Sequence, residues 1–309
     1  MRVFVSYSHA QSDWVARELC VVLRAGGADV LVDSERFKAG GALVGQMDAL
    51  QDQAEIHVLV LSPEYVASTY CMHELRRAVS PDPLFTGRRV VPVVRVPCQL
   101  PTEIVPAGHE PLRVEFREGH EDAAWRLLLE ACSASLGCSA RNWLDARRDL
   151  DLSLARHESV NLVVRGHVAW RPLIAQAAGA LQHQAQLGVV DLASGTASSR
   201  RGLLTEMLDV CGHRTQLPSS RGNEDLVAFT RALRSRATPA FVALQHFDYA
   251  LLDDRDYGLS FFSALRDLAA NDRKLCLLVH SKVPFLELLP AGHPLSSLTQ
   301  LRVLELAES

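Results

Sequence analysis

A single carboxylate stands among polar, aromatic and sulfur side chains in the segment 68–75, STYCMHEL. A carboxylate such as Glu74 can stabilise positive charge that develops on a reacting group, so Glu74 is a candidate for a catalytic residue. The alternative is a solvated carboxylate in the first turn of a helix, where the dipole favours negative charge.

Other reactive groups do not form a recognisable site. Cys71 lies near Glu74, but only His73, its neighbour but one, could activate its thiol. The segment 73–77, HELRR, lacks the second histidine one turn later that a zinc-binding helix requires, so no metal is predicted. The seven cysteines include no CxxC pair, which indicates reduced thiols.

Short apolar runs alternate with helical periods in the first half of the chain. Each run is short enough to be a buried strand, and the runs lie at 2–6, 28–32, 56–61, 89–96 and 112–116. Helices are expected from Ser12 to Gly26 and near 42–53, 71–79 and 120–136. This alternation favours a parallel sheet covered on both faces, whose ligands bind outside the carboxyl ends of the strands.

Three segments carry a family resemblance, in the family's order and at plausible spacing. They are VFVSYSHAQSDW at 3–14, LVDSERFKAGG at 31–41 and LVLSPEYVASTYCMHEL at 59–75. Together they resemble the bacterial branch of the TIR family over about residues 1–135. Tyr70 stands where the family commonly has tryptophan, so the aromatic character of the position is kept.

The resemblance implies a flavodoxin-like α/β fold with a five-stranded parallel sheet. It also implies cleavage of the nicotinamide–ribose bond of NAD, or transfer of the ADP-ribosyl part, with Glu74 as the catalytic glutamate. NAD would be the substrate, and no cofactor is expected. The residues expected around the substrate are Tyr7, Ser8, Asp33, Arg36, Phe37, Lys38, Ser62, Tyr70 and Cys71.

Two other functions stay open for the same segments. The domain could be a non-catalytic scaffold that recruits other TIR domains, or a cyclase that makes a signalling nucleotide. Members of the family often associate through their TIR domains to complete the pocket, so the resemblance implies self-association and low activity of the monomer. A role as an antiphage or conflict effector follows from the bacterial branch of the family.

A second series of strands and helices predicts a second α/β domain. The expected strands lie at 160–165, 187–192, 239–244, 275–280 and 301–306, and the helices at 172–185, 199–210, 224–235 and 259–270. The segment 161–174 has a strand, a glycine and a helix start, as a phosphate-binding loop does. However, Arg171, Pro172 and Leu173 occupy the places where a Walker loop needs glycine, lysine and a hydroxyl.

The strand at 239–244 is likewise followed by Gln245 and His246, where metal-holding acidic residues are required. The second domain thus resembles a STAND-type, P-loop-NTPase-like core that lacks Walker motifs, and no ATP hydrolysis is expected. The alternative is an unrelated α/β domain. The predicted organisation is a TIR domain at 1–136, a linker at 137–158 and a regulatory domain at 159–309 that docks a partner protein.

Composition excludes several classes of partner. The net charge of −4 over 309 residues gives no broad attraction to nucleic acid or anionic membranes. The first residues turn polar too early for a secretory signal, and no apolar run approaches the length of a membrane span. A cytoplasmic protein is expected.

Overall fold

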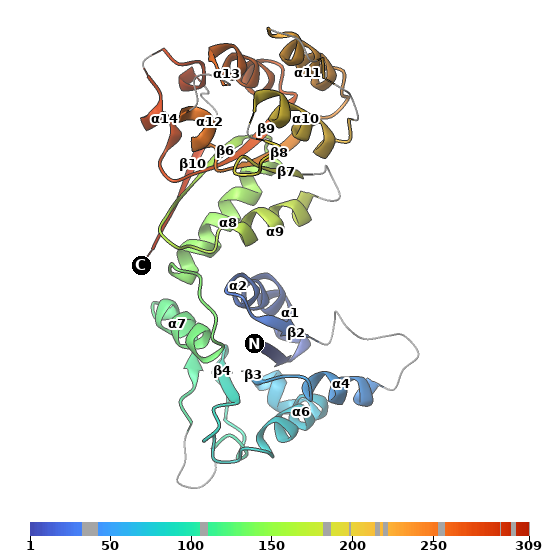
Figure 1. Cartoon of the computed structure of the whole chain (residues 1–309). Coiled ribbons are helices and arrows are strands. Elements are labelled where there is room, and N and C mark those ends of the chain that lie inside the picture. Colours follow the sequence, from blue (N-terminus) through green and yellow to red (C-terminus); the bar gives the residue numbers. More distant parts are fainter. Residues whose placement is uncertain are drawn as a thin grey trace. The chain divides into compact units, whose positions relative to one another are not determined.

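The computed structural model describes residues 1–32, 43–105, 111–181, 187–197, 199–213, 217–218, 222–252, 257–290, 292–297 and 301–308. The chain divides into two compact units, Met1–Leu144 and Asp145–Ser309 (Figure 1). Each unit is built on its own five-stranded parallel sheet, which confirms the predicted fold class of two α/β domains.

The sheet of the first unit has the strand order β2-β1-β3-β4-β5, with all neighbours parallel. Its strands are β1 Arg2–Tyr7, β2 Asp29–Leu31, β3 Ile56–Leu61, β4 Val90–Val94 and β5 Val114–Glu115. Its helices and turns are η1 His9–Gln11, α1 Ser12–Trp14, the π-helical turn η2 Val15–Leu19, α2 Cys20–Ala25, α4 Leu43–Gln51, α5 Pro63–Ala67, α6 Thr69–Val79 and α7 Glu121–Ala131. The order 2-1-3-4-5 is that of the flavodoxin-like fold.

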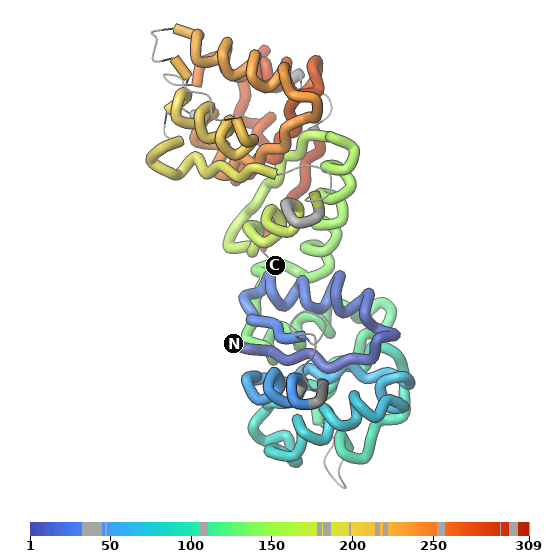
Figure 2. Tube along the Cα trace, turned by 90° about the vertical axis from the view of Figure 1, so that its right-hand side faces the viewer, coloured from blue at the N-terminus to red at the C-terminus, as the bar shows by residue number. Residues whose placement is uncertain are grey.

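The centre of this sheet is apolar on both faces. All six residues of β3, IHVLVL, are buried, as expected for a strand that lies between two parallel neighbours. Helices α1 and α2 cover one face of the sheet, and α4 and α6 cover the other (Figures 1 and 2). The helix that carries Glu74 is therefore packed against the sheet.

The sheet of the second unit has the order β10-β6-β9-β8-β7, again with all neighbours parallel. Its strands are β6 Ser159–Arg165, β7 Leu187–Asp191, β8 Ala240–Gln245, β9 Leu275–Ser281 and β10 Leu301–Ala307. The other elements are α9 Arg171–Leu181, α10 Arg200–Val210, α11 Glu224–Arg234, α12 Asp248–Leu252, α13 Leu259–Arg266, the π-helical turn η3 Asp267–Asn271, α14 Phe285–Leu288 and η4 Pro294–Ser297.

One further helix, α8 Ala140–Ala155, occupies most of the segment expected to be a linker. Trp143, Leu150 and Leu154 on this helix are buried, at exposures of 0, 1 and 1%. Their spacing of about two turns and one turn places them on one side of the helix. This apolar stripe is hard to recognise in the sequence because the segment 137–158 is mostly charged and polar. The division between the two units, after Leu144, falls inside this helix.

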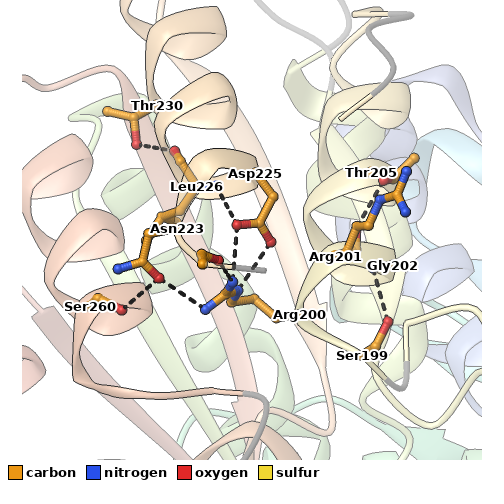
Figure 3. A network of polar contacts seen from close by, with 11 residues as sticks. Ser199, Arg200, Arg201, Gly202, Thr205, Asn223, Asp225, Leu226, Thr230 and Ser260 are labelled. Atoms are coloured by element: carbon orange, nitrogen blue, oxygen red, sulfur yellow. Dashed lines mark hydrogen bonds and ion pairs between the residues drawn. The ribbon is translucent and has the colours of Figure 1, made fainter. Parts of the chain in front are cut away.

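A polar network joins the starts of α10 and α11 (Figure 3). The guanidinium of Arg200 donates to both carboxylate oxygens of Asp225, at 3.1 and 3.0 Å, and to the side-chain oxygen of Asn223 at 3.2 Å. Asp225 also accepts from the backbone N–H of Leu226 at 2.8 Å. Because Asp225 is buried, this bidentate pair fixes the two helices where their first turns meet.

Within the described residues, no helix combines the length and the apolar character needed to cross a bilayer. The same residues include no group of three or more histidine, cysteine or acidic side chains placed to hold a metal ion. The cysteines form no disulfide.

Candidate functional site

The strand order of the first sheet marks one place for a ligand. In a 2-1-3-4-5 sheet the connections leave β1 and β3 toward opposite faces, which opens a crevice at the carboxyl ends of these two strands. Strand β1 ends at Tyr7 and β3 at Leu61, and the register pairs Ser6 with Leu59 and Tyr7 with Val60. Side chains from both strand ends and from the helices that follow β3 therefore meet at this edge.

Helix α6 carries Glu74 into the first unit. Ser68 caps the helix by accepting a hydrogen bond from the backbone N–H of Cys71 at 3.3 Å, so Glu74 lies in the second turn. The buried residues of this helix are Cys71, Glu74, Leu75, Ala78 and Val79. Their spacing of i, i+3, i+4, i+7 and i+8 is that of one apolar face, and Glu74 occupies a position within it. The carboxylate is therefore not the solvated group in a first turn that was the alternative, because only 6% of Glu74 is exposed.

Two hydroxyl groups connect to this carboxylate. Ser6 Oγ donates to Glu74 Oε2 at 2.5 Å, and the Tyr65 hydroxyl lies 2.8 Å from the same Ser6 oxygen. Because the single hydroxyl hydrogen of Ser6 is given to the carboxylate, Tyr65 must be the donor to Ser6. The direction of the chain is thus Tyr65 to Ser6 to Glu74, and it ends on an acceptor.

The environment keeps Tyr65 protonated for this role. Burial raises the pKa of the Tyr65 hydroxyl well above its ordinary value, and the charge of Glu74 adds to the shift, while the bond with Ser6 opposes it. The ring is fully buried. Tyr65 is held in the first turn of α5 because Ser62 Oγ accepts from its backbone N–H at 3.2 Å. A second tether acts on α6 itself, since the Gln51 side-chain amide donates to the backbone carbonyl of Glu74 at 2.7 Å.

The residues expected around the substrate take different positions. Cys71 is buried and its Sγ donates to the Tyr7 carbonyl at 3.6 Å, which brings these two residues together beside α6. Ser62 is fully buried as the cap of α5, and Ser8 caps η1. Tyr70 is 54% exposed at the start of α6.

Four more of the expected residues, Asp33, Arg36, Phe37 and Lys38, lie outside the described residues.

The family comparison agrees with this arrangement. The sequence model of the TIR domain family matches residues 3–129. The first unit carries a TIR domain. A solved TIR domain, that of the Toll-related receptor TRR-2 from Hydra magnipapillata, is similar at 17% identity and a TM-score of 0.36, over 42% of this chain and 97% of that chain.

Other solved structures are similar over the rest of the chain or over most of it. The ORC1 protein of Aeropyrum pernix, solved in complex with DNA, has 12% identity and a TM-score of 0.40, over 53% of this chain and 44% of that chain. NtrX from Brucella abortus, solved in complex with ATP, has 10% identity and a TM-score of 0.35, over 99% of this chain and 68% of that chain. A search of curated proteins found no match.

The domain after the TIR domain has a different carboxyl edge. Helix α9 begins at Arg171, and its second and third residues, Pro172 and Leu173, stand where a phosphate-binding loop would place its lysine and hydroxyl. The Trp170 ring stacks on the His280 ring at a centroid distance of 3.7 Å. The Arg171 guanidinium lies over the same Trp170 ring, at 4.8 Å from its centroid. The end of β6 is thus occupied by aromatic and imidazole side chains.

A histidine–aspartate pair completes this edge. His246 Nδ1 lies 2.7 Å from Asp191 Oδ1, and the His246 backbone, which has a left-handed φ of 56°, donates its N–H to His280 Nδ1 at 3.2 Å. Burial, aided by nearby positive charge, lowers the pKa of His280 to about 4, so its ring is neutral and can accept this bond. His246 is thus hydrogen-bonded within the domain at the position where a nucleotide hydrolase would need acidic residues.

Sequence reasoning did not assign Ser6, Tyr65 or Gln51 to the site. Ser6 and Tyr65 lie in the family segments 3–14 and 59–75, but nothing in their local sequence says that they meet. The usable signal was Glu74 itself. A charged residue at a core position of a helical stripe requires a partner, and the carboxyl ends of β1 and β3 are where that partner had to be found.

Proposed function

We propose that the TIR domain cleaves the nicotinamide–ribose bond of NAD, with Glu74 as the catalytic carboxylate. One observation carries the proposal: Glu74 is buried at the β1/β3 edge and accepts a 2.5 Å hydrogen bond from Ser6, which is itself oriented by Tyr65. A carboxylate in the apolar face of a helix is unfavourable for stability alone. Its position is the one expected for electrostatic catalysis in a site that excludes water.

The reaction needs little from the protein beyond this carboxylate. The bond between ribose C1′ and the pyridinium nitrogen breaks, and its electron pair neutralises the ring, so nicotinamide leaves without a proton. Positive charge develops on the ribose, and Glu74 stabilises it while accepting hydrogen bonds from ribose hydroxyls. Water then adds to C1′ and releases one proton, which gives ADP-ribose.

The burial of Glu74 bears on how activity is controlled. Since 6% of the residue is exposed, ribose reaches the carboxylate only after neighbouring groups move. We expect self-association of TIR domains to drive this change, so that activity rises steeply with protein concentration. The second domain would then act as the regulatory part that docks a partner, and we expect no ATP hydrolysis from it.

The test is release of nicotinamide by the full chain, over a range of protein concentrations and with a crowding agent. Glu74→Gln and Glu74→Ala are expected to lower turnover by about 100-fold or more. Glu64→Gln is the matched control, because Glu64 is an exposed carboxylate on the preceding helix α5. Equal turnover by wild type and both Glu74 variants would show that the assignment of the catalytic residue is wrong.

The same experiment separates the alternatives. Wild-type protein that associates but never releases nicotinamide would indicate a scaffold. Chromatography of the products distinguishes ADP-ribose from a cyclic nucleotide or a base-exchange product, each of which would keep Glu74 as the catalytic residue.

A further inference from the structure

A cavity lies at the carboxyl edge of the TIR sheet, at the ends of β4 and β5. It has a volume of about 190 Å³ and is lined by three arginines, Arg95, Arg113 and Arg117, together with Glu115 and Phe116. Strand β4 is two strand spacings from β1, which is roughly 10 Å along the same edge as Ser6. The cavity is therefore distinct from the Glu74 site but opens on the same side of the sheet.

Two of the three arginines at this cavity are paired with its carboxylate. Arg113 and Arg117 each form an ion pair with Glu115, one on each carboxylate oxygen. The hydrogen bond from Arg113, together with the charges of both arginines, lowers the pKa of Glu115, so this carboxyl stays ionised. Arg113 and Arg117 thus have a carboxylate beside them, and Arg95 is not paired with it. The charge of another carboxylate, Glu64, acts on Cys98 in the cavity wall. Glu64 is exposed on α5, so solvent screens its attraction to the arginines.

Arg95 is the arginine of this cavity that does not pair with Glu115. Among the described residues its side chain forms no ion pair, and its buried Nε atom has no hydrogen-bond partner. The guanidinium lies over the Trp14 ring at 5.2 Å, and Trp14 packs edge to face with Phe116 at 5.1 Å. This aromatic support holds the group in one orientation at the cavity wall. A guanidinium that is oriented in advance and has no anion beside it can form bidentate hydrogen bonds to a phosphate.

We infer that this cavity binds a phosphate group carried by a small organic molecule such as a nucleotide. Guanidinium groups match the geometry of phosphate oxygens, and the apolar side chains of Val94, Leu100 and Phe116 offer contact to an attached ring. The volume corresponds to about six water molecules, enough for a phosphate and part of the group that it is attached to. The inference goes beyond the proposed function and holds whether or not Glu74 cleaves NAD.

The test is calorimetric titration of the full chain at low salt with AMP, with adenosine and with inorganic phosphate. AMP is expected to bind, phosphate to bind more weakly, and adenosine not to bind. Arg95→Gln should weaken AMP binding by about tenfold to a hundredfold, the range for a lost hydrogen bond to a charged group. Arg126→Gln is the matched control, because Arg126 is an exposed arginine on α7 outside the cavity, and it should bind AMP as the wild type does.

Two further variants keep the result interpretable. Arg117→Gln changes a side chain that is 70% exposed, so it should fold normally and still weaken AMP binding. Glu74→Gln should bind AMP unchanged, which separates this inference from the proposed catalysis. The inference is overturned if AMP fails to bind the wild type, or binds Arg95→Gln and Arg117→Gln with unchanged affinity. It is also overturned if Arg95→Gln alters only the oligomeric state, since the cavity would then belong to a protein contact.

Discussion

Replacing Ser6 by alanine should destabilise the TIR domain mainly through the charge of Glu74. The substitution removes the donor to Oε2 and leaves the buried Tyr65 hydroxyl without its acceptor. A hydrogen bond to a charged group contributes about 1.5–3 kcal/mol and a neutral one about 1 kcal/mol. Ser6→Ala is therefore expected to lower the free energy of unfolding of this domain by about 2.5–4 kcal/mol.

The double-mutant cycle with Glu74→Gln tests the cause. Glutamine keeps hydrogen-bonding groups at the position but removes the buried charge, so this variant alone should be nearly neutral or stabilising. In Ser6→Ala/Glu74→Gln the charged part of the penalty is gone. The double variant should therefore be more stable than the sum of the single changes predicts, by about 1–2 kcal/mol.

Hydrogen exchange followed by mass spectrometry gives the required domain-level stability in the full chain. Peptides from β1 and β3 report on the TIR domain, and peptides from β8 and β9 in the second unit are the internal control. Additive effects, within about 0.5 kcal/mol, would refute the hydrogen-bonded chain that ends on Glu74.

Three further predictions concern stability. Burial lowers the pKa of His57 from 6.5 to about 4, so the unfolded chain takes up a proton that the folded domain excludes. Stability should thus be complete above about pH 6.5 and fall by up to about 3 kcal/mol as the pH decreases to 4. His57→Gln should flatten the pH dependence of hydrogen exchange in β3, and an unchanged slope would contradict this. Asp225→Ala should lower the free energy of unfolding by about 3 kcal/mol, the low end for a broken buried ion pair, because 21% of the Arg200 side chain is exposed. Adding Arg200→Ala should restore part of this loss, and urea unfolding measures both variants. Gly202→Ala would make Cβ clash with the Thr196 carbonyl oxygen, so we expect the free energy of unfolding to fall by about 1–3 kcal/mol and the melting temperature to decrease. An unchanged melting temperature would show that the loop can move without penalty.

The sequence was sufficient to predict the strands and most helices because hydrophobic periodicity is a local signal. The runs at 56–61 and 160–165 match β3 and β6 within one residue. Glu74 could also be singled out as a candidate, since its position in the segment 68–75 is fixed by local spacing, and its catalytic role stays a prediction. What could not be derived was which strands are neighbours, and the contact of Ser6 with Tyr65, 59 positions away, depends on β1 lying beside β3.

Asn161 illustrates the same limit in the second sheet. It lies in the apolar run 160–164, where its polarity had no local explanation. The structure brings β9 beside β6, so the Asn161 amide donates to the Val279 carbonyl and to Ser281 Oγ and accepts from the Phe285 N–H. A fully buried amide with all these partners joins the two strands to α14. The partners are more than 100 positions away in sequence, beyond the reach of any periodicity.

Both sheets are five-stranded and parallel, yet the side chains at their carboxyl edges differ in kind. At the TIR edge a carboxylate is buried beside hydroxyl groups, and the free energy of its burial is offset only in part by the hydrogen bond from Ser6. At the edge of the second sheet, Trp170, His246 and His280 satisfy one another by stacking and hydrogen bonding, and the burial of His280 removes a charge from the site. An edge whose polar groups are already paired gains little from a phosphate. This contrast favours the TIR domain over the second domain as the place of the chemistry proposed above.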